Sequence, residues 1–365
     1  MAATVKEPLV RIVKRTDIST KKALAIRICA VLIAFVVSGL TVLLITGGKI
    51  SFIGVYKEMF SGAFGTLRRF KILVRDTCAL LFLGVALAPA FKMRFWNIGA
   101  EGQALVGALS ACIVVKLLPD MPSAVLLIVM FIASMIAGAI WGIIPGFFKA
   151  TLKANETLFT LMMNYVAIQL VKFFVVLWEK QKGAGVMSTL TTGKLPQLFG
   201  VDYGWSIIII LAFTLAMYVY MKYSKQGYEV SVVGESENTA RYIGINVKKV
   251  IIRTMAISGA LCGIAGFLLV SGTHHLVKSD LVGGNGFTAI IVAWLAHLNP
   301  LLMILTSLFV SFLDIGTSKI ASSCNLNDFA SDVVVGIALF IVLASEFFIS
   351  YKIIFKHSKE AKEGK

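Results

Sequence analysis

Long apolar runs alternate with short polar segments along most of the chain. Most of the runs are about 15–22 residues long, the length that an α-helix with a rise of 1.5 Å per residue needs to cross about 30 Å of hydrocarbon. Ten such runs are present: 28–46, 77–91, 102–118, 123–147, 158–178, 206–221, 251–270, 287–298, 301–318 and 333–351. The pattern predicts an all-α, polytopic membrane protein with about ten transmembrane helices. The short runs 77–91 and 287–298 favour broken or tilted helices buried within the bundle.

Composition supports this assignment and excludes two other classes of protein. Of the 365 residues, 58% are hydrophobic and 15% are charged, and the mean hydropathy is +0.87. A soluble domain has about 45–50% apolar and about 25% charged residues, so an ordinary cytosolic enzyme and a disordered chain are both excluded. The five cysteines are scattered and form no CxxC or Cys/His spacing, so we predict that they are small apolar residues and hold no metal.

The distribution of charge predicts the orientation in the membrane. The net charge is +16, and in so apolar a chain this favours basic loops on the cytoplasmic side over binding to nucleic acid. With the N-terminus inside, the inner segments carry 22 Lys and Arg residues and the outer segments carry 11. We therefore predict that both termini are cytoplasmic. The predicted organisation is a basic segment 1–27, a transmembrane domain 28–351 that contains a cytoplasmic loop 222–250, and a tail 352–365.

One outer segment, 47–76, runs against this rule. It holds six basic residues: Lys49, Lys57, Arg68, Arg69, Lys71 and Arg75. Large apolar residues lie among them: Phe60, Phe64, Leu67 and Phe70. The mixture predicts an amphipathic helix in the membrane interface.

The motifs of several enzyme classes are missing from the sequence. No segment matches GxxxxGK[ST], HExxH or GxSxG, so the sequence offers neither a phosphate-binding loop nor a hydrolytic centre. We predict that the chain is not an enzyme and binds no cofactor.

Two glycine-rich segments open predicted helices that start from opposite sides of the membrane. They are 99–102, before the third run, and 283–286, before the eighth. Inverted repeats that meet near the midplane are a common plan in transporters, whereas close packing through small residues is the structural alternative.

Four polar or aromatic residues fall at mid-depth in two predicted helices: Asn164, Tyr165, Trp294 and His297. Amide hydrogen bonds and an aromatic face would suit a neutral ligand with a flat ring, so these residues are candidates for a substrate path. Hydrogen bonding between helices is the alternative.

The loop 222–250 is the longest predicted cytoplasmic connection. Ser236 or Asn238 can cap a short helix that runs through Ala240 and Tyr242 and ends at Gly244. A rigid helix in such a loop favours docking to a soluble partner over a bare surface helix.

Five ordered motifs resemble a known family. They are FWNIGAEGQ at 95–103, NETLFTLMMNY at 155–165, the segment 234–247, SGALCGIAG at 258–266, and GFTAIIVA at 286–293 closed by Asn299-Pro300. The chain resembles the permease subunits of bacterial ABC importers for nucleosides and simple sugars, in the branched-chain amino acid and ribose permease superfamily. Its long basic N-terminus resembles the longer of the two paralogous permeases of nucleoside-type systems.

The resemblance implies a type II ABC importer-like permease domain with inverted repeats in a bacterial plasma membrane. It also implies three protein partners: an ATPase that uses the ATP, a second permease, and an extracellular substrate-binding lipoprotein. The segment 234–247 corresponds to the family's coupling segment, with candidate contacts at Glu237, Ala240, Arg241, Tyr242 and Gly244. The first motif supplies a candidate structural turn with five residues: Asn97, Gly99, Glu101, Gly102 and Gln103.

Several functions remain open from the sequence. Purine nucleosides are the preferred cargo, and riboflavin or a sugar is the alternative. An ion-coupled secondary transporter and a membrane scaffold without transport activity are the other classes. The position of the acidic residues near the ends of the runs disfavours the secondary transporter, and the polar residues at mid-depth disfavour the scaffold.

Overall fold

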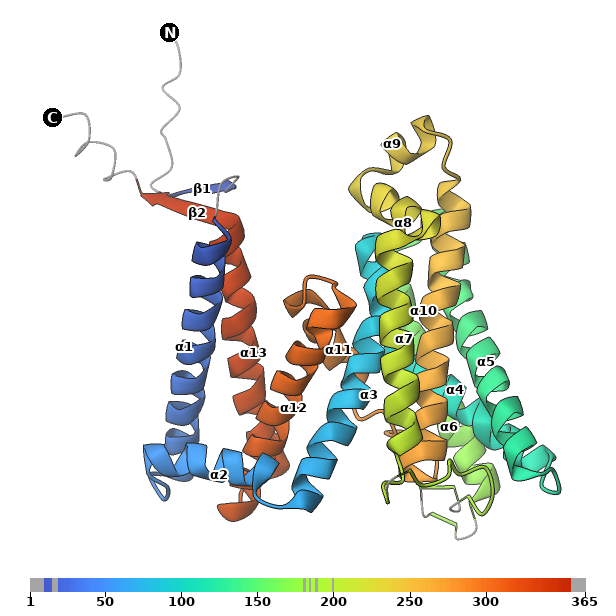
Figure 1. The fold of residues 1–365 in the computed structure, drawn as a ribbon, viewed down its shortest axis with the longest axis horizontal. Coiled ribbons are helices and arrows are strands. Elements are labelled where there is room, and N and C mark those ends of the chain that lie inside the picture. The colour runs from blue at the N-terminus through green and yellow to red at the C-terminus, as the bar shows by residue number, and fades with distance from the viewer. Residues whose placement is uncertain are drawn as a thin grey trace, which may run out of the picture. The chain divides into compact units, whose positions relative to one another are not determined.

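The computed structural model describes residues 10–14, 19–179, 182–183, 185–187, 190–198 and 200–355, and it is almost entirely helical (Figure 1). The elements in chain order are β1 Val10–Lys14, α1 Thr20–Thr46, α2 Phe52–Phe64, α3 Leu67–Lys92, α4 Ala100–Leu117, α5 Ser123–Leu152, α6 Glu156–Trp178, α7 Gly204–Tyr223, α8 Lys225–Glu235, α9 Glu237–Tyr242, α10 Val247–Leu269, the π-helical turn η1 Val270–His274, α11 Asn285–Leu295, α12 Pro300–Ser323, α13 Asp328–Ser350 and β2 Tyr351–Phe355. Within the described residues, nine helices are long and apolar enough to cross a membrane, and α11 is a shorter apolar helix. The prediction of an all-α, polytopic protein is confirmed.

The helix bounds correct the prediction of a broken helix at 77–91 and the count of ten membrane-spanning helices. The run 77–91 is part of α3, a helix of 26 residues whose first turns carry Arg68, Arg69, Lys71 and Arg75, so the second span is neither short nor broken. The run 287–298 forms only the 11-residue helix α11, which is about 17 Å long and cannot span the membrane alone. Thus ten apolar runs give nine long helices and one half-length helix in the part of the chain that the structure describes.

The chain forms two compact units, of which the first comprises residues up to Thr66 and from Phe312 onward. In this unit α1 packs along α13, and β1 pairs antiparallel with β2, from Val10 opposite Phe355 to Lys14 opposite Tyr351. This pairing places the segments before α1 and after α13 on the same side of the unit. The predicted segments 1–27 and 352–365 extend beyond the described residues at 1–9, 15–18 and 356–365.

The predicted interfacial helix in 47–76 is not one helix. The chain turns at Gly65 and Thr66, which separates α2 from α3. In the first unit α2 is amphipathic, and its buried face includes Met59 and Gly62, which pack on α12 at Gly316 and Lys319. The large apolar residues of α2 therefore pack against protein as well as facing outward.

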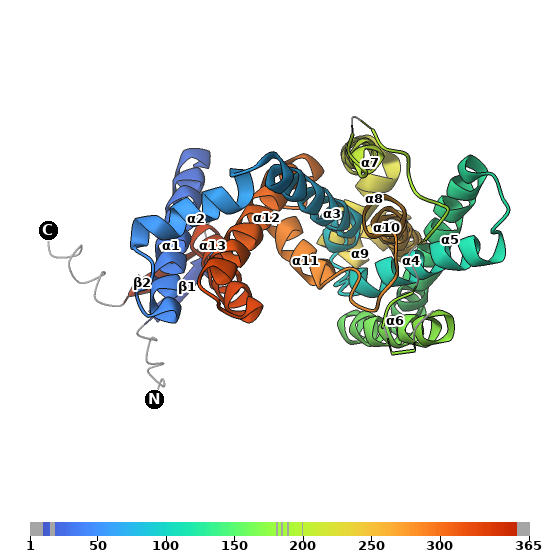
Figure 2. The same ribbon diagram turned by 90° about the horizontal axis from the view of Figure 1, so that it is seen from below.

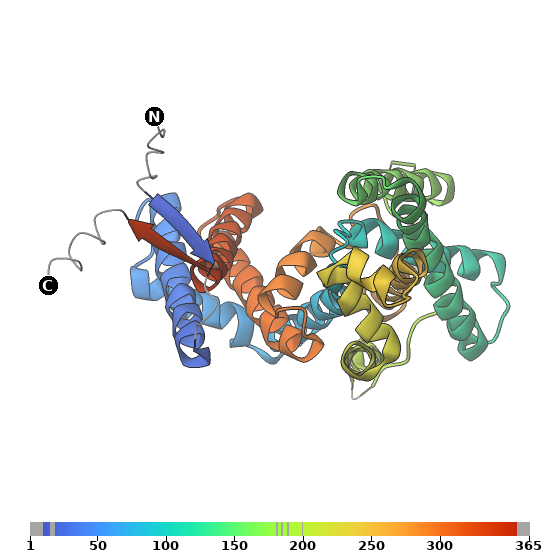
Figure 3. The same ribbon diagram turned by 90° about the horizontal axis from the view of Figure 1, so that it is seen from above.

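The second unit, Leu67–Ser311, is built around α10. Figures 2 and 3 show α10 and α4 surrounded by α3, α5, α6 and α7. Glycines allow this packing: a Cβ at Gly107 or Gly138 would collide with the backbone of α10 at Gly259 and Gly263. Helices with such faces approach closely because no side chain separates them.

The connections of the second unit alternate between its two ends. At one end, Arg94, Lys149 and Ser236 line a common hollow of about 200 Å³, and α9 projects there (Figure 1). At the opposite end, the backbone N–H of Leu190 donates to the carbonyl of His275, which joins the segments after α6 and after η1. We call these the α9 end and the far end. Their alternation follows the predicted order of inner and outer loops.

Candidate functional site

The connection between α3 and α4 turns back into the interior of the second unit. After Lys92, at the α9 end, residues 93–99 form no regular helix and can reach about 23 Å when extended. Asn97 is fully buried, and its Nδ2 donates to Ser258 Oγ at 3.2 Å and to Gln103 Oε1 at 3.3 Å, while its Oδ1 accepts from Gly99 N at 2.9 Å. Ser258 is the twelfth of the 23 residues of α10, about 16 Å from its start. The turn at Asn97 therefore lies halfway along a membrane-spanning helix.

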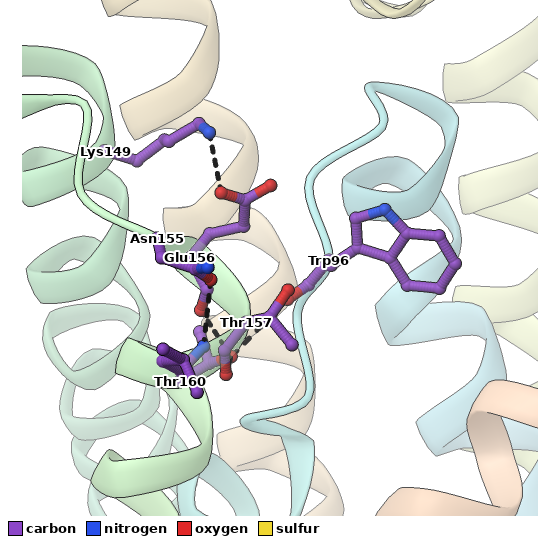
Figure 4. Close-up of polar contacts among 7 residues, drawn as sticks. Trp96, Lys149, Asn155, Glu156, Thr157 and Thr160 are labelled. Atoms are coloured by element: carbon purple, nitrogen blue, oxygen red, sulfur yellow. Dashed lines mark hydrogen bonds and ion pairs between the residues drawn. The ribbon is translucent and has the colours of Figure 1, made fainter.

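Two side chains on one face of α6 hold this turn. Thr160 Oγ1 accepts from Ile98 N at 3.2 Å. It also lies 3.4 Å from the carbonyl oxygen of Trp96, and Figure 4 shows the two residues side by side. Asn164 Oδ1 accepts from Gly102 N at 2.9 Å, and its Nδ2 donates to Ile98 O at 2.8 Å. Asn164 is 2% exposed, so its amide is occupied by backbone groups and does not line an open surface. Asn164 was a candidate both for a substrate path and for hydrogen bonding between helices, and in the structure its amide makes hydrogen bonds.

Glu101 joins α4 to the start of α11. The carboxylate accepts from Gly284 N at 3.0 Å and from Gly286 N at 2.8 Å, and the residue is 6% exposed. Gly284, at the N-cap of α11, has no side chain to satisfy these amides. A Cβ at Gly286 would lie 2.6 Å from Glu101 N, so only glycine allows this approach. Glu101 thus caps α11 from a different helix. Its carboxylate also interacts favourably with the positive end of the α11 dipole.

The two helices that start at this junction run toward opposite ends. Along α4, Gly107 meets Gly263, which lies beyond Ser258 toward the far end of α10. Along α11, Trp294 meets Trp96 and Phe91, close to where α3 ends at the α9 end. The segments 99–102 and 283–286 therefore meet in space, and each opens a helix that leaves mid-depth in the opposite direction. Two helices that leave one mid-depth junction in opposite directions are the arrangement expected where inverted repeats meet.

An aromatic surface adjoins the junction. The rings of Trp96 and Trp294 stack with centroids 5.5 Å apart and planes 20° apart, and Phe91 packs at their edge. Trp96 is 46% exposed and Trp294 is 40% exposed. Trp96 and Ile98 are two residues apart on the loop, so Trp294 and Asn164 contact the same loop at different residues.

Of the two other candidate path residues, His297 adjoins this surface, since its backbone N–H donates to the carbonyl of Trp294 at 2.9 Å, whereas Tyr165 lies on α6. Tyr165 is 59% exposed on α6 and lines a separate shallow hollow with Val166, Gln169 and Phe173. His297 is exposed just after α11, with a positive φ of 50°. Among the described residues, no group of His, Cys, Asp and Glu side chains could hold a metal ion.

Comparison with known sequences decides the family. The family described as "Branched-chain amino acid transport system / permease component" matches residues 70–343, which is most of the chain. The chain belongs to this family. It is therefore a multi-pass membrane protein of the transporter permease class, and this class is not enzymatic.

Several relatives that are named as ABC transporter permeases match most of the chain. It is 29% identical to the guanosine ABC transporter permease protein NupP of Bacillus subtilis, over 90% of this chain and 94% of that protein. It is 27% identical to the glucose ABC transporter permease protein TsgB13 of Haloferax volcanii, over 89% of this chain and 88% of that protein. It is 28% identical to the nucleoside ABC transporter permease protein NupB of Lactococcus lactis, over 72% of this chain and 75% of that protein.

The short helix predicted in the loop 222–250 of the permease is present as α9. Ser236 is its N-cap, with Oγ accepting from Thr239 N at 3.2 Å, and Gly244 follows it with a φ of +83°. Ala240 is buried beneath the helix, whereas Tyr242 is 91% exposed. Arg241 Nη2 lies 3.2 Å from Glu237 Oε2 in an exposed pair one turn apart. The helix therefore exposes a cation and an aromatic ring on a fixed support.

Several positioning residues of the permease had no assigned role in the sequence analysis. Thr160 lies one turn before Asn164 on the same face of α6, a spacing that could have suggested it. Ser258, Gly284 and Gly286 lie in segments that the sequence analysis singled out, but their partners could not be inferred because these are far away in sequence.

Proposed function

We propose that the chain is the transmembrane subunit of an ATP-driven importer that moves a neutral small solute, most specifically nucleosides, into a bacterial cell. The meeting of the starts of α4 and α11 at mid-depth carries this proposal, because transporter sites form where such helix ends meet. The names of the Bacillus and Lactococcus relatives support nucleosides as the cargo, and the Haloferax relative makes a sugar the second candidate.

The proposal places the α9 end and both termini in the cytoplasm. Basic residues favour that side, and the β1–β2 pairing keeps the two terminal segments together. A separate ATPase subunit binds α9 and hydrolyses the ATP, so this chain itself needs no nucleotide or other cofactor. A second permease subunit, a paralogue of this chain, completes the path in the bilayer, and an extracellular lipoprotein delivers the cargo. Nucleic acid has no part in this scheme.

The deciding experiment is uptake by a strain that carries the complete system. Labelled guanosine and labelled glucose are supplied in turn, with and without a functional ATPase subunit. Guanosine uptake that requires the ATPase supports the proposal. If only glucose is taken up in an ATPase-dependent way, the cargo is a sugar and not a nucleoside. Uptake that persists without the ATPase but stops when a protonophore collapses the ion gradient would establish a secondary transporter instead.

The first prediction concerns coupling. Replacing both Arg241 and Tyr242 by Ala removes the two side chains that α9 presents, while Ala240 still anchors the helix. The variant should accumulate normally in the membrane but lose uptake and substrate-stimulated ATP hydrolysis. Tyr228, which is 62% exposed on α8, provides the control Tyr228→Ala. Unchanged uptake together with unchanged stimulated hydrolysis in the double variant would contradict docking at α9.

The second prediction concerns the cargo. We propose that the Trp96–Trp294 surface contacts a ring-bearing solute as it passes, since aromatic pairs contribute about 0.5–1.5 kcal/mol. Trp294→Ala should therefore slow nucleoside uptake by about 2- to 10-fold at matched expression. Asn164→Ala should also slow uptake, but through loosening of the turn at Ile98 and Gly102, and it should lower thermal stability as well. If neither variant slows uptake, the path lies elsewhere.

The control for this experiment is Trp205→Ala. Trp205 is 40% exposed, as Trp294 is, but it lies in the first turn of α7, at the far end of the unit. A wild-type system that transports only sugars would remove the nucleoside assignment and leave the importer assignment standing.

A further inference from the structure

The α8 helix and the loop that follows α3 share one apolar cluster. Val230 and Val233 of α8 pack in it with Met93 and Phe95 of the loop. Ala240 of α9 and several residues of the first half of α10 complete the cluster, among them Val250, Ile251 and Met255. Because interiors are close-packed, a displacement of α8 and α9 must displace the start of this loop too.

Backbone contact reinforces this connection. Gly234, near the end of α8, packs directly on the chain where α3 ends: a Cβ there would collide with the carbonyl oxygen of Lys92 and lie 3.2 Å from Met93 Cα. No flexible side chain separates the two backbones. Movement at the end of α8 is therefore passed to Lys92 and Met93 with little loss.

A second connection runs from α8 to α10. Glu229 Oε2 of α8 lies 3.0 Å from Arg253 Nη2 of α10, and the two side chains are 18% and 23% exposed. Arg253 lies five residues before Ser258, about 7.5 Å along the same helix. An ion pair that is partly shielded from water is screened less by salt than an exposed one, so it attracts the two helices to each other more strongly than a surface pair would.

Both connections end at Asn97. The loop 93–99 carries Asn97 at its inner turn, and Ser258 of α10 accepts a hydrogen bond from Asn97 Nδ2. Four residues later, Glu101 holds the start of α11. A change at α9 can therefore reach the junction of α4 and α11 along the loop and along α10, and the two routes meet at the buried side chain of Asn97.

We propose that Glu229 and Arg253 are positioning residues that couple α8 and α9 to the junction of α4 and α11, and that the coupling reaches this junction through Asn97. The inference rests on the proposed function for its role in transport. The pair keeps α8 in register with α10, so that docking and release of the ATPase at α9 shift the loop 93–99 and the start of α10 together. The ends of α4 and α11 at Glu101 then open or close in response.

The test is charge reversal in the complete transporter, reconstituted in proteoliposomes with its ATPase and binding protein. Glu229→Arg and Arg253→Glu each place two like charges together, and the double variant restores an ion pair. Each single variant should lower the uptake supported by a given rate of ATP hydrolysis by about 5- to 150-fold, the usual span of coupling between two sites. The double variant should recover most of this loss. Lys278→Asp is the matched control, because its pair with Asp280 is exposed at the far end.

A second measurement needs no partner protein. In the purified permease, Glu229→Arg should speed hydrogen exchange at the backbone amides of 93–99, and the double variant should slow it again. Single variants that assemble and keep wild-type coupling would overturn the inference, and so would a double variant that assembles but stays uncoupled. Wild-type protein that transports nothing with ATP would refute the proposed function, while the exchange measurement still decides whether the pair controls the loop.

Discussion

Glu101→Lys should abolish transport and sharply reduce the amount of folded protein, whereas Glu101→Gln should lower both only in part. The carboxylate accepts two backbone hydrogen bonds at the start of α11, and bonds to charged groups contribute about 1.5–3 kcal/mol each. Gln keeps one acceptor oxygen but turns an amide donor toward the other N–H group. Lys keeps no acceptor and places a cation at the positive end of the α11 dipole.

Fluorescence-detected size-exclusion chromatography and thermal unfolding in detergent measure the folded fraction, and nucleoside uptake measures transport. Glu179 is a matched control because its carboxylate also accepts from two glycine amides, Gly183 N at 2.7 Å and Gly185 N at 3.2 Å, but on the surface. Glu179→Lys should therefore have a small effect. Wild-type behaviour of both Glu101 variants would show that the junction does not depend on this carboxylate.

The Glu101 contacts mark a limit of prediction from sequence. A carboxylate in the first turn of α4 is expected to stabilise its own helix by interacting with the positive end of the α4 dipole. Its partners are instead Gly284 and Gly286, 183 and 185 residues away in sequence. Local patterns describe which groups need a partner, but they do not specify which distant segment supplies it.

Features that depend on neighbouring residues were predictable. The cap at Ser236, the helix to Tyr242 and the turn at Gly244 all follow from groups within one or two turns of each other. The start of α3 was not predictable from hydropathy, because four basic residues interrupt the apolar run in the first turns. Once the helix is formed, such long side chains can extend to the membrane interface while the helix continues beneath them.

Asn164 illustrates a different limit. A polar residue at mid-depth is consistent with a substrate path and with a structural hydrogen bond, and spacing alone does not separate the two. The structure shows both amide atoms bonded to the turn at Ile98 and Gly102. The hypothesis that a solute touches this side chain directly therefore gives way to one in which it holds the loop that carries Trp96.

The last prediction concerns the glycine contacts of α4, α5 and α10. A Cβ at Gly263 would collide with the carbonyl of Ser134 and approach Gly138 Cα at 3.0 Å, and Gly107 of α4 packs against the same residue. Backbone atoms cannot rotate away as side chains can, so the helices themselves must separate. Gly263→Ala should cost at least about 1–3 kcal/mol of stability, and Gly263→Leu should prevent accumulation of folded protein.

Gly336→Ala is the matched control, since this glycine of α13 has open space where its Cβ would lie. It should be neutral or slightly stabilising, because Ala favours a helix over Gly by about 1 kcal/mol. Thermal unfolding in detergent compares the two variants without requiring transport. Equal unfolding temperatures for Gly263→Ala and Gly336→Ala would mean that α10 does not pack on α4 and α5 through its glycines. A large difference would mean that α10 is held in place by backbone contacts. Under this condition a shift of α10 at Arg253 reaches Ser258, because no flexible side chains lie between the helices to take it up.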